Sequence, residues 1–305
     1  MRDEDFDFQA YIAAQKEPAG RARLLRFGTY AFRGDIKDLR LLHALPPVRM
    51  VVGAGRQLWL GWGRSAVLKD ARRVGDKGTE RLARLSQHCL QALQMPSLPI
   101  YVTHHLRSLG AQALGDAEEA FVAVHHEAAT VRSDEALRFM LGRELGHVQN
   151  GHVPHCTALF YADEIAGTAV RWALRPGLLA LRRWRRHAAL TADRAGLLCC
   201  HSVEVATQEI CRALVAAQRQ KQDVDLAEVM AQVMAVVGGE KASGDETEAL
   251  ADAALRVAAL QRFAQSQYYY DHLKVRDDKG QTLAEIDDQL EGMLRGYWGP
   301  KEARG

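Results

Sequence analysis

The segment LGRELGHVQNGH, residues 141–152, differs at one position from a pattern that binds zinc. In H-E-x-x-H on a helix, the two histidines lie four residues apart on one face, so both can bind one metal ion, and the glutamate polarises the metal-bound water. Glu144 and His147 fit this pattern, but Arg143 stands at the first histidine position. Because a guanidinium stays protonated and cannot bind zinc, one ligand is lost.

A helix must carry these residues, and the surrounding sequence predicts one. Ser133 is a typical N-cap and acidic residues follow it, so we expect the helix to run from there to about Gly151. Apolar residues recur at steps of three and four, as in one buried stripe: Leu137, Met140, Leu141, Leu145 and Val148. Residues 98–103 and 120–131, which precede this helix, have the composition of strands.

A second segment, RRHAALTADRAGLL (185–198), follows later in the chain. The order of strand, acidic helix start, LGRELGHVQNGH and this segment resembles the M48 family of zinc metallopeptidases, which has a gluzincin-type core. Three more segments resemble parts of that family: RSAVLKDARRV (64–74), AQALGDAEEAFVAV (111–124) and LRVAALQRFAQSQYY (255–269), in which Arg256 matches a family arginine. The resemblance covers residues 35–215 and the 255–269 helix. It implies an α+β fold, with a mainly α-helical core and a small β-sheet packed beside the active-site-type helix.

The resemblance also assigns roles, and by it two of three zinc ligands are absent. Glu144 matches the general-base position, and His147 matches the second ligand. The third ligand position, four residues before Asp193, holds Ala189. Asp193 itself is retained, and in the family this residue supports the first ligand. A catalytic zinc site needs three protein ligands and an open position for water, and His147 alone does not provide that.

We expect Arg143 to replace the metal as a fixed positive charge. Asp193 loses the imidazole that it would support, and a buried carboxylate without a partner is costly. A guanidinium can supply that partner through a bidentate pair. The sequence therefore predicts the Arg143 guanidinium close to Glu144 or Asp193, in a cleft without zinc.

Other histidines leave a rebuilt metal site open as an alternative. His152, His155 and His187 are the candidates that would have to join His147. Against this, the spacing of the first two from position 147 does not keep one helical face, and a glycine and a proline between them are expected to end the helix.

The resemblance further implies a place for a peptide. In metallopeptidases of this kind, substrate lies along the edge strand beside the active-site helix and adds a strand through backbone hydrogen bonds, which need no metal. Residues 120–127 would form that edge. Its peptide-binding residues would be Phe121, Val122, Ala123, Val124, His125 and His126. Because side chains alternate along a strand, at most one of the two histidines can face the cleft.

Composition narrows the class of protein. Of 305 residues, 48% are hydrophobic, which is enough for a substantial core, and 40 basic residues nearly balance 38 acidic ones, so no nucleic-acid partner is expected. The N-terminus lacks the apolar part of a signal peptide, and no apolar run is long enough for a transmembrane helix. The cysteines are odd in number and match no zinc spacing, so they are interpreted as reduced, mostly buried thiols of a cytoplasmic protein.

The chain is predicted to have three parts. They are a polar N-terminal segment (1–34), a metallopeptidase-like domain (35–219) and a helical C-terminal extension packed on it (220–305). Further helices are expected at 35–45, 77–95, 158–174, 177–200, 203–219, 225–237, 246–272 and 281–296. The third and fourth of these would be separated at Arg175-Pro176-Gly177, and residues 48–68 are interpreted as a connector with a possible strand.

Three functions follow as hypotheses. The first is a catalytically inactive protein of this fold, without a cofactor, that binds a protein or an extended peptide as a scaffold subunit. The alternative is an active zinc endopeptidase with a non-standard site that uses Glu144 and His147. The third is a membrane-surface protein anchored by residues 166–187, where basic residues from Arg182 to Arg186 flank Trp184. The sequence does not predict the oligomeric state of the protein.

Overall fold

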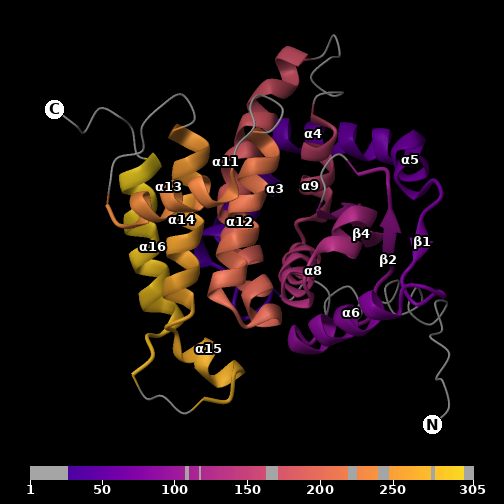
Figure 1. The fold of residues 1–305 in the computed structure, drawn as a ribbon. Helices are drawn as coiled ribbons and strands as arrows, with labels where there is room; N and C mark the ends of the chain where they lie inside the picture. Colours follow the sequence, from indigo (N-terminus) through magenta and orange to yellow (C-terminus); the bar gives the residue numbers. More distant parts are fainter. Residues whose placement is uncertain are drawn as a thin grey trace.

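The computed structural model describes residues 27–106, 110–116, 118–162, 171–218, 225–239, 247–275 and 279–298. Within these residues, helices surround one four-stranded sheet (Figure 1). This architecture confirms the α+β fold class and the mainly helical core with a small sheet that the sequence predicted.

The sheet has the strand order β1-β2-β4-β3. Its strands are β1 (Arg72–Arg73), β2 (Ile100–Thr103), β3 (Ala111–Gly115) and β4 (Ala120–His125). β4 runs parallel to β2 and antiparallel to β3, and β1 is antiparallel to β2. The strand expected at 98–103 is therefore present as β2.

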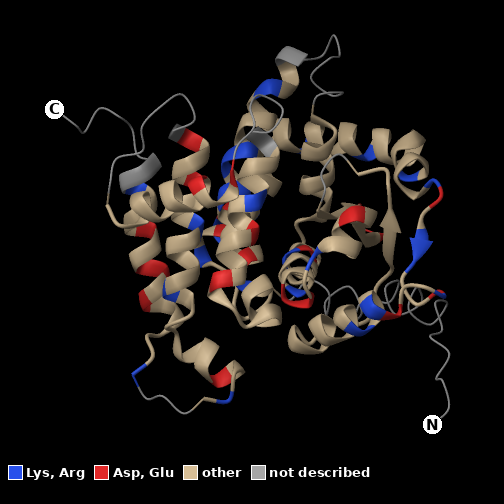
Figure 2. Ribbon diagram, in the orientation of Figure 1, with Lys and Arg blue, Asp and Glu red and all other residues tan. Residues whose placement is uncertain are grey.

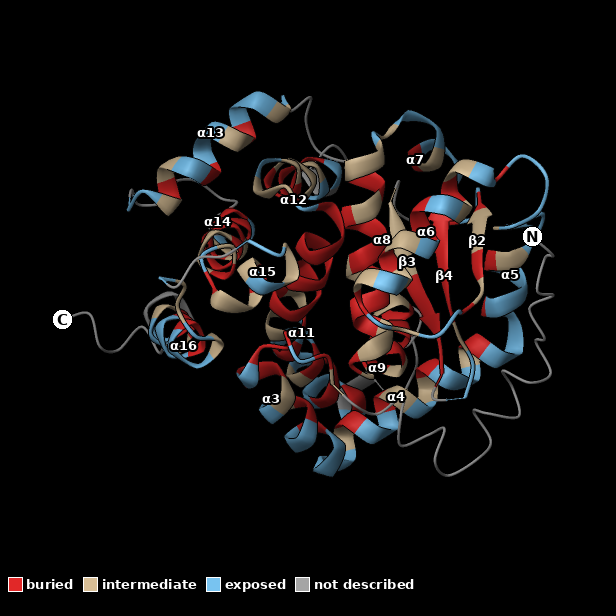
Figure 3. Ribbon diagram, turned by 90° about the horizontal axis from the view of Figure 1, so that it is seen from below, coloured by how far each residue is buried: buried red, intermediate tan, exposed pale blue. Residues whose placement is uncertain are grey.

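Each face of the sheet is covered by helices. Val122 and Val124 of β4 share an apolar core with α6 (Glu80–Ala92) and α8 (Asp134–Gln149). Phe121 and Ala123 share a second core with α4 (Pro46–Leu58) and α9 (Val153–Phe160). Successive residues of β4 thus face opposite layers, as the two-residue period of a strand requires, and Figure 3 shows β4 buried between them.

The prediction that residues 120–127 form the edge strand is wrong. β4 lies inside the sheet, hydrogen-bonded to β2 on one side and to β3 on the other. The strand also ends at His125, because α7 (His126–Val131) begins there, so His126 belongs to a helix. The edge beside α8 is β3 instead. Its sequence, AQALG, has no β-branched residue, so composition alone did not distinguish it as a strand.

The helix that carries the motif begins where the sequence predicted. Ser133 is the N-cap of α8, and its hydroxyl accepts a hydrogen bond of 3.2 Å from the Ala136 backbone N–H. The apolar stripe faces inward, with Leu137, Leu141 and Leu145 fully buried. α8 ends at Gln149, two residues before Gly151, whose φ of +72° does not continue a helix.

α8 packs against α11 (Arg171–Cys200) with no space for side chains where the two helices meet. A Cβ on Gly142 would lie 2.7 Å from a cysteine sulfur of α11, and one on Gly146 would lie 2.6 Å from the Ala195 Cβ. From the other helix, a Cβ on Gly196 would lie 2.8 Å from the Cγ of Arg143. These three glycines therefore allow the buried sides of the two helices to touch.

The predicted break at Arg175-Pro176-Gly177 is wrong, because α11 continues through Pro176. The glycine has a packing role instead. A Cβ at Gly177 would lie 2.3 Å from the carbonyl oxygen of Pro47, at the start of α4. Close contact with α4 thus supports α11 at the position where local sequence favoured an end.

The helix predicted at 158–174 is not observed with those bounds, because α9 ends at Phe160 and residues 163–170 lie outside the described part. The remaining helices follow the predicted pattern with two differences. They are α3 (Arg33–Ala44), α5 (Arg64–Leu68), α12 (Val203–Gln218), α13 (Leu226–Val237), α14 (Thr247–Phe263), α15 (Gln267–His272) and α16 (Leu283–Trp298). Residues 48–68 are helical, with a π-helical turn (Trp59–Gly63) between α4 and α5, rather than a connector. The single helix expected at 246–272 is divided, because Ser266 caps α15 through its hydroxyl.

The C-terminal helices share the main core. Val233 of α13 and Phe263 of α14 belong to the same apolar cluster as Leu145 of α8. The end of the predicted N-terminal polar segment, residues 27–34, also enters the interior, where Tyr30 and Phe32 are buried. The predicted polar character therefore does not extend to residue 34, while residues 1–26 lie outside the described part.

None of the helices in the described part is long and apolar enough to cross a membrane. The proposed surface anchor covers residues 166–187, and the structure describes it from residue 171. Three large apolar side chains of this part face inward. Leu178, Leu181 and Trp184 belong to the core beside α4 and α9. These side chains are not available to a lipid surface.

The contact between α8 and α11 predicts a difference between two glycines. Gly142→Ala would place a methyl group 2.7 Å from the Cys199 Sγ and is expected to destabilise the protein by about 1–3 kcal/mol, as overpacking does. Gly53→Ala, in α4, has no atom within 4 Å and is expected to be neutral or to stabilise by about 0.5–1 kcal/mol. Urea unfolding measures both, and equal effects of the two substitutions would contradict the close contact.

Candidate active-site region

Asp193 of α11 lies between two arginines from different helices. Its Oδ1 accepts a hydrogen bond of 2.8 Å from the Nε of Arg143, which is on α8. Arg256, on α14, binds both oxygens: its Nε donates to Oδ2 at 2.7 Å and its Nη2 to Oδ1 at 2.8 Å. The contact expected between Arg143 and Asp193 is present, and the second arginine makes it a junction of three helices.

The charged side chains of this junction are largely buried. The Asp193 side chain is 2% exposed, whereas those of Arg143 and Arg256 are 22% and 13% exposed. Although burial alone would lower the pKa of Arg256, the charge of Asp193 and its hydrogen bonds raise that pKa above its usual value. Two further carboxyl groups, Glu144 and Asp252, lie near enough to interact electrostatically with these guanidinium groups.

Glu144 is turned toward the sheet. Its side chain is buried, and its Oε2 accepts a hydrogen bond of 2.7 Å from the backbone N–H of Ala113, in β3. Burial raises the pKa of Glu144, against the opposing effects of Arg143 and of the Ala113 hydrogen bond. The carboxylate that matches a general base therefore contacts an edge strand.

His147 begins a buried chain of polar contacts. Its Nδ1 lies 3.0 Å from the Nδ1 of His152, and the Nε2 of His152 lies 3.1 Å from the Oδ2 of Asp35 in α3. All three side chains are less than 10% exposed. Burial lowers the pKa of His147 well below its usual value, so at neutral pH this imidazole is uncharged.

Asp35 completes this chain and was not singled out in the sequence. Its Oδ1 accepts a hydrogen bond of 2.9 Å from the Trp184 indole, and its Oδ2 accepts one of 2.6 Å from the Thr191 hydroxyl. Burial alone would raise the pKa of Asp35, but His152 and these donors lower it below its usual value. An aspartate near the start of a helix is a common capping residue, so its sequence position carried no sign of this role.

A comparison with protein families supports the resemblance found in the sequence. The family model described as Peptidase family M48 matches residues 76–266, which is more than half of the chain. The chain belongs to peptidase family M48. No curated protein matches it, and neither does a solved structure. The family match crosses the predicted domain boundary at 219, and that boundary stays a prediction.

The zinc that this family usually requires does not fit the side chains in the region. No group of three or more His, Cys, Asp and Glu residues in the described part could hold a metal ion. Arg143 and Ala189 supply no metal donor at two of the three ligand positions. Cys156 lies 3.9 Å from the Nδ1 of His147, but burial raises the pKa of its thiol to about 12, so it is protonated.

Two of the three histidines proposed as helpers have partners away from His147. His155 stacks on His43, with ring centroids 5.2 Å apart, and burial lowers its pKa to about 3. The Nδ1 of His187 lies 2.7 Å from the Oδ2 of Asp38. His152 contacts His147, but the same imidazole is held by Asp35 on its other side. Of the three, only His152 therefore lies beside His147.

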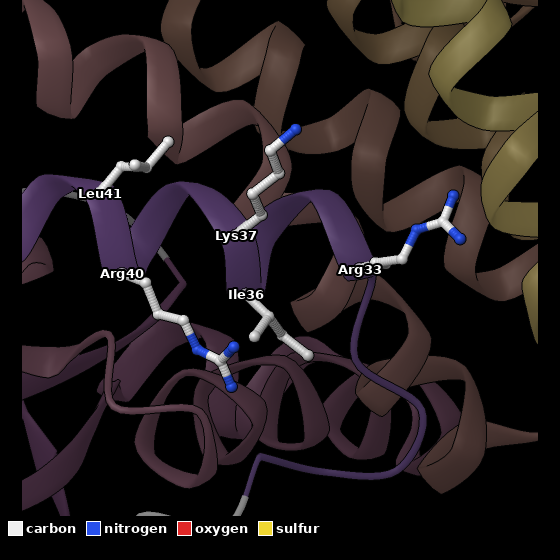
Figure 4. A pocket seen from close by; sticks show the side chains of 5 residues that line it. All are labelled: Arg33, Ile36, Lys37, Arg40 and Leu41. Atoms are coloured by element: carbon white, nitrogen blue, oxygen red, sulfur yellow. The ribbon is translucent and has the colours of Figure 1, made fainter.

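Two basic features outside this region do not form a ligand site. Figure 2 shows basic residues on α11 beside acidic residues of neighbouring helices, and Arg186 pairs with Glu248 and Asp252 of α14. An open pocket on α3 is lined by Arg33, Ile36, Lys37, Arg40 and Leu41. Lys37 and Arg40 point to opposite sides of that helix in Figure 4, so their charges do not converge on one ligand.

The junction at Asp193 predicts unequal effects of its two arginines. Arg256→Met removes a bidentate partner and leaves a buried carboxylate with one hydrogen bond, so we expect a loss of about 2–4 kcal/mol in the free energy of unfolding. Arg143→Met leaves the bidentate pair and is expected to cost about 1 kcal/mol.

Chemical denaturation of both variants and of the double variant measures these losses and their coupling. Arg33→Met is a matched control, because this arginine pairs with acids at the surface, and its midpoint should not change. A larger loss for Arg143→Met than for Arg256→Met would contradict the assigned geometry.

The buried neutral His147 predicts an acid-sensitive stability. The unfolded chain binds a proton at this imidazole near its usual pKa of about 6.5, whereas the folded protein does not. The folded state therefore binds fewer protons, and stability falls as pH drops below about 6.5, by at most about 1.4 kcal/mol per pH unit from this group.

His147→Gln should reduce this loss between pH 7.5 and 5, whereas His126→Gln, at an exposed histidine, should not. Urea unfolding at several pH values gives both slopes. Identical slopes for the wild-type protein and His147→Gln would show that His147 does not resist protonation in the folded state.

Proposed function

We propose that this member of peptidase family M48 does not cleave peptides and instead binds a protein or an extended peptide. The observation that carries the proposal is the environment of Asp193. In the family this carboxylate supports the first zinc ligand, and here it accepts hydrogen bonds from two arginines, one of which occupies that ligand position. A fixed guanidinium charge thus lies where a metal would need an imidazole.

Two further observations support the loss of catalysis. Ala189, at the third ligand position, has no donor atom. Glu144 directs its Oε2 to the Ala113 backbone N–H of β3, so one of its two carboxylate oxygens is engaged by the sheet. General-base catalysis needs a carboxylate within hydrogen-bond reach of the water that it activates.

The retained fold supports a binding role. The chain belongs to the family although the donor set for zinc is incomplete, and one fold can carry functions other than the family's reaction. With nearly balanced charge, we propose a protein or peptide partner rather than nucleic acid. All five cysteines are buried free thiols, in keeping with a reducing, cytoplasmic location.

The test is zinc content together with cleavage of casein. We expect purified, untagged protein to hold far less than one equivalent of zinc by inductively coupled plasma mass spectrometry, and to leave casein intact after prolonged incubation with added zinc. Glu144→Gln should behave identically in the cleavage assay. One equivalent of zinc, with cleavage that Glu144→Gln abolishes, would instead establish the alternative of a zinc endopeptidase with a non-standard site.

A restoring variant serves as the positive control. Arg143→His with Ala189→Glu returns donors to both missing ligand positions, so this double variant is expected to retain more zinc than the wild-type protein. Arg143→Gln with Ala189→Glu is the matched control, since it makes the same change in charge but supplies no imidazole at the first ligand position. Equal zinc retention by the two double variants would show that other changes in the region also exclude the metal.

A further inference from the structure

The outward edge of β3 is occupied by side chains of two helices. Gly110, Leu114 and Asp116 direct their backbone groups toward β4 and the turn before it. The Gly110 carbonyl accepts a hydrogen bond from the His125 N–H, and the Asp116 N–H donates one to the Glu119 carbonyl. In an antiparallel pair, alternate residues point their backbone groups away from the partner strand. Ala111, Ala113 and Gly115 are such residues. The N–H groups of Ala113 and Gly115 form the part of this edge that the two helices cover.

Both of these N–H groups already have acceptors. The Ala113 N–H donates to the Oε2 of Glu144 at 2.7 Å, and the Gly115 N–H donates to the Oγ1 of Thr157 at 3.0 Å. Glu144 belongs to α8 and Thr157 to α9, so each helix contributes one acceptor. Both side chains are buried, at 5% and 1% exposed, and Ala113 has no exposed surface.

The strand is also held at its turn. Gly115 has a φ of +140°, and a Cβ there would lie 2.0 Å from the Glu119 carbonyl oxygen, so a glycine is required. The Oδ1 of Asp116 accepts from the backbone N–H groups of Glu118 and Glu119, and its Oδ2 accepts from Arg56 of α4. β3 is therefore fixed at its end as well as along its outer side.

We infer that Glu144 and Thr157 seal the outer edge of β3, and that Glu144 serves as a positioning residue for this strand in place of a general base. An edge strand exposes unpaired N–H groups to other chains, and native proteins cover such edges. Here the cover is the residue that matches the family's catalytic glutamate. This inference deepens the proposed function: strand addition at Ala113 and Gly115 is closed, so a partner binds on another surface.

The seal also accounts for the retention of Glu144 beside lost zinc ligands. Without an acceptor, the Ala113 N–H would be a buried, unsatisfied donor, which is costly. A carboxylate at position 144 removes that cost whether or not a metal is bound. Replacing it affects the sheet, and the effect does not depend on hydrolysis.

The experiment is amide hydrogen exchange, followed by NMR on protein labelled with 15N at alanine and glycine. Glu144→Ala should accelerate exchange of the Ala113 amide about tenfold or more and leave the Gly115 amide nearly unchanged. Thr157→Val, which keeps the side-chain shape, should do the reverse. Glu144→Gln retains an acceptor oxygen and should keep Ala113 protected, which distinguishes a hydrogen-bonding role from packing alone.

Glu135→Ala is the control, because Glu135 is on the same helix but pairs with Arg138 near the surface. The amides of Val122 and Val124 report whether a variant loosens the whole sheet. Unchanged protection of Ala113 in Glu144→Ala would overturn the inference, and so would equal acceleration at Ala113 and Gly115 in both single variants. Should Glu144→Ala fail to fold, Glu144→Met, which removes the acceptor and keeps the side-chain length, tests the Ala113 amide in its place, and Thr157→Val tests the Gly115 amide.

A second arm uses the wild-type protein with reduced, carboxymethylated lactalbumin, a permanently unfolded polypeptide, as the probe. A sealed edge predicts no added protection of the Ala113 and Gly115 amides at a large excess of this probe. Added protection confined to these amides would overturn the seal and would place an extended partner on β3. The zinc and casein assays are independent of this result, so failure of the seal and failure of the non-catalytic proposal are separately visible.

Discussion

The shared carboxylate of Asp193 is the interaction on which the centre of this protein depends. It holds Arg143 of α8 and Arg256 of α14 against α11, so three helices from distant parts of the sequence meet at one buried group. The arrangement is possible only because α8 and α11 approach at Gly142, Gly146 and Gly196. A buried ion pair is strongly destabilising when one partner is removed, so these positions constrain one another.

The polar side chains at the family's motif positions contact other protein groups in this structure. His147 contacts His152, which is held by Asp35, and Glu144 binds the backbone of β3. Each of these buried groups has a partner from another element, as low dielectric surroundings require. Together these contacts link α3, α8, the start of α9 and the sheet.

Much of the fold was predictable from local patterns, for identifiable reasons. Ser133 and the apolar stripe after it marked α8, because a side-chain cap and a helical period are both local signals. Local signals failed at Pro176, because α11 continues through it and Gly177 packs against α4. They also failed at β3, because its sequence AQALG does not have the composition of a strand. Residues 120–125 were recognised as a strand, but their place inside the sheet was not, since strand order is set by pairing between distant segments.

The sequence by itself determined which donor atoms exist. Arg143 and Ala189 exclude two zinc ligands because a guanidinium and a methyl group cannot bind the metal, whatever the fold. Only the tertiary structure decided where the remaining groups point: Arg143 to Asp193 rather than to Glu144, Glu144 to β3, and His152 to Asp35. These contacts join residues 31 to 117 positions apart in the sequence, and chain proximity carries no information at such separations. Which buried donor meets which acceptor is settled by how the helices and the sheet pack.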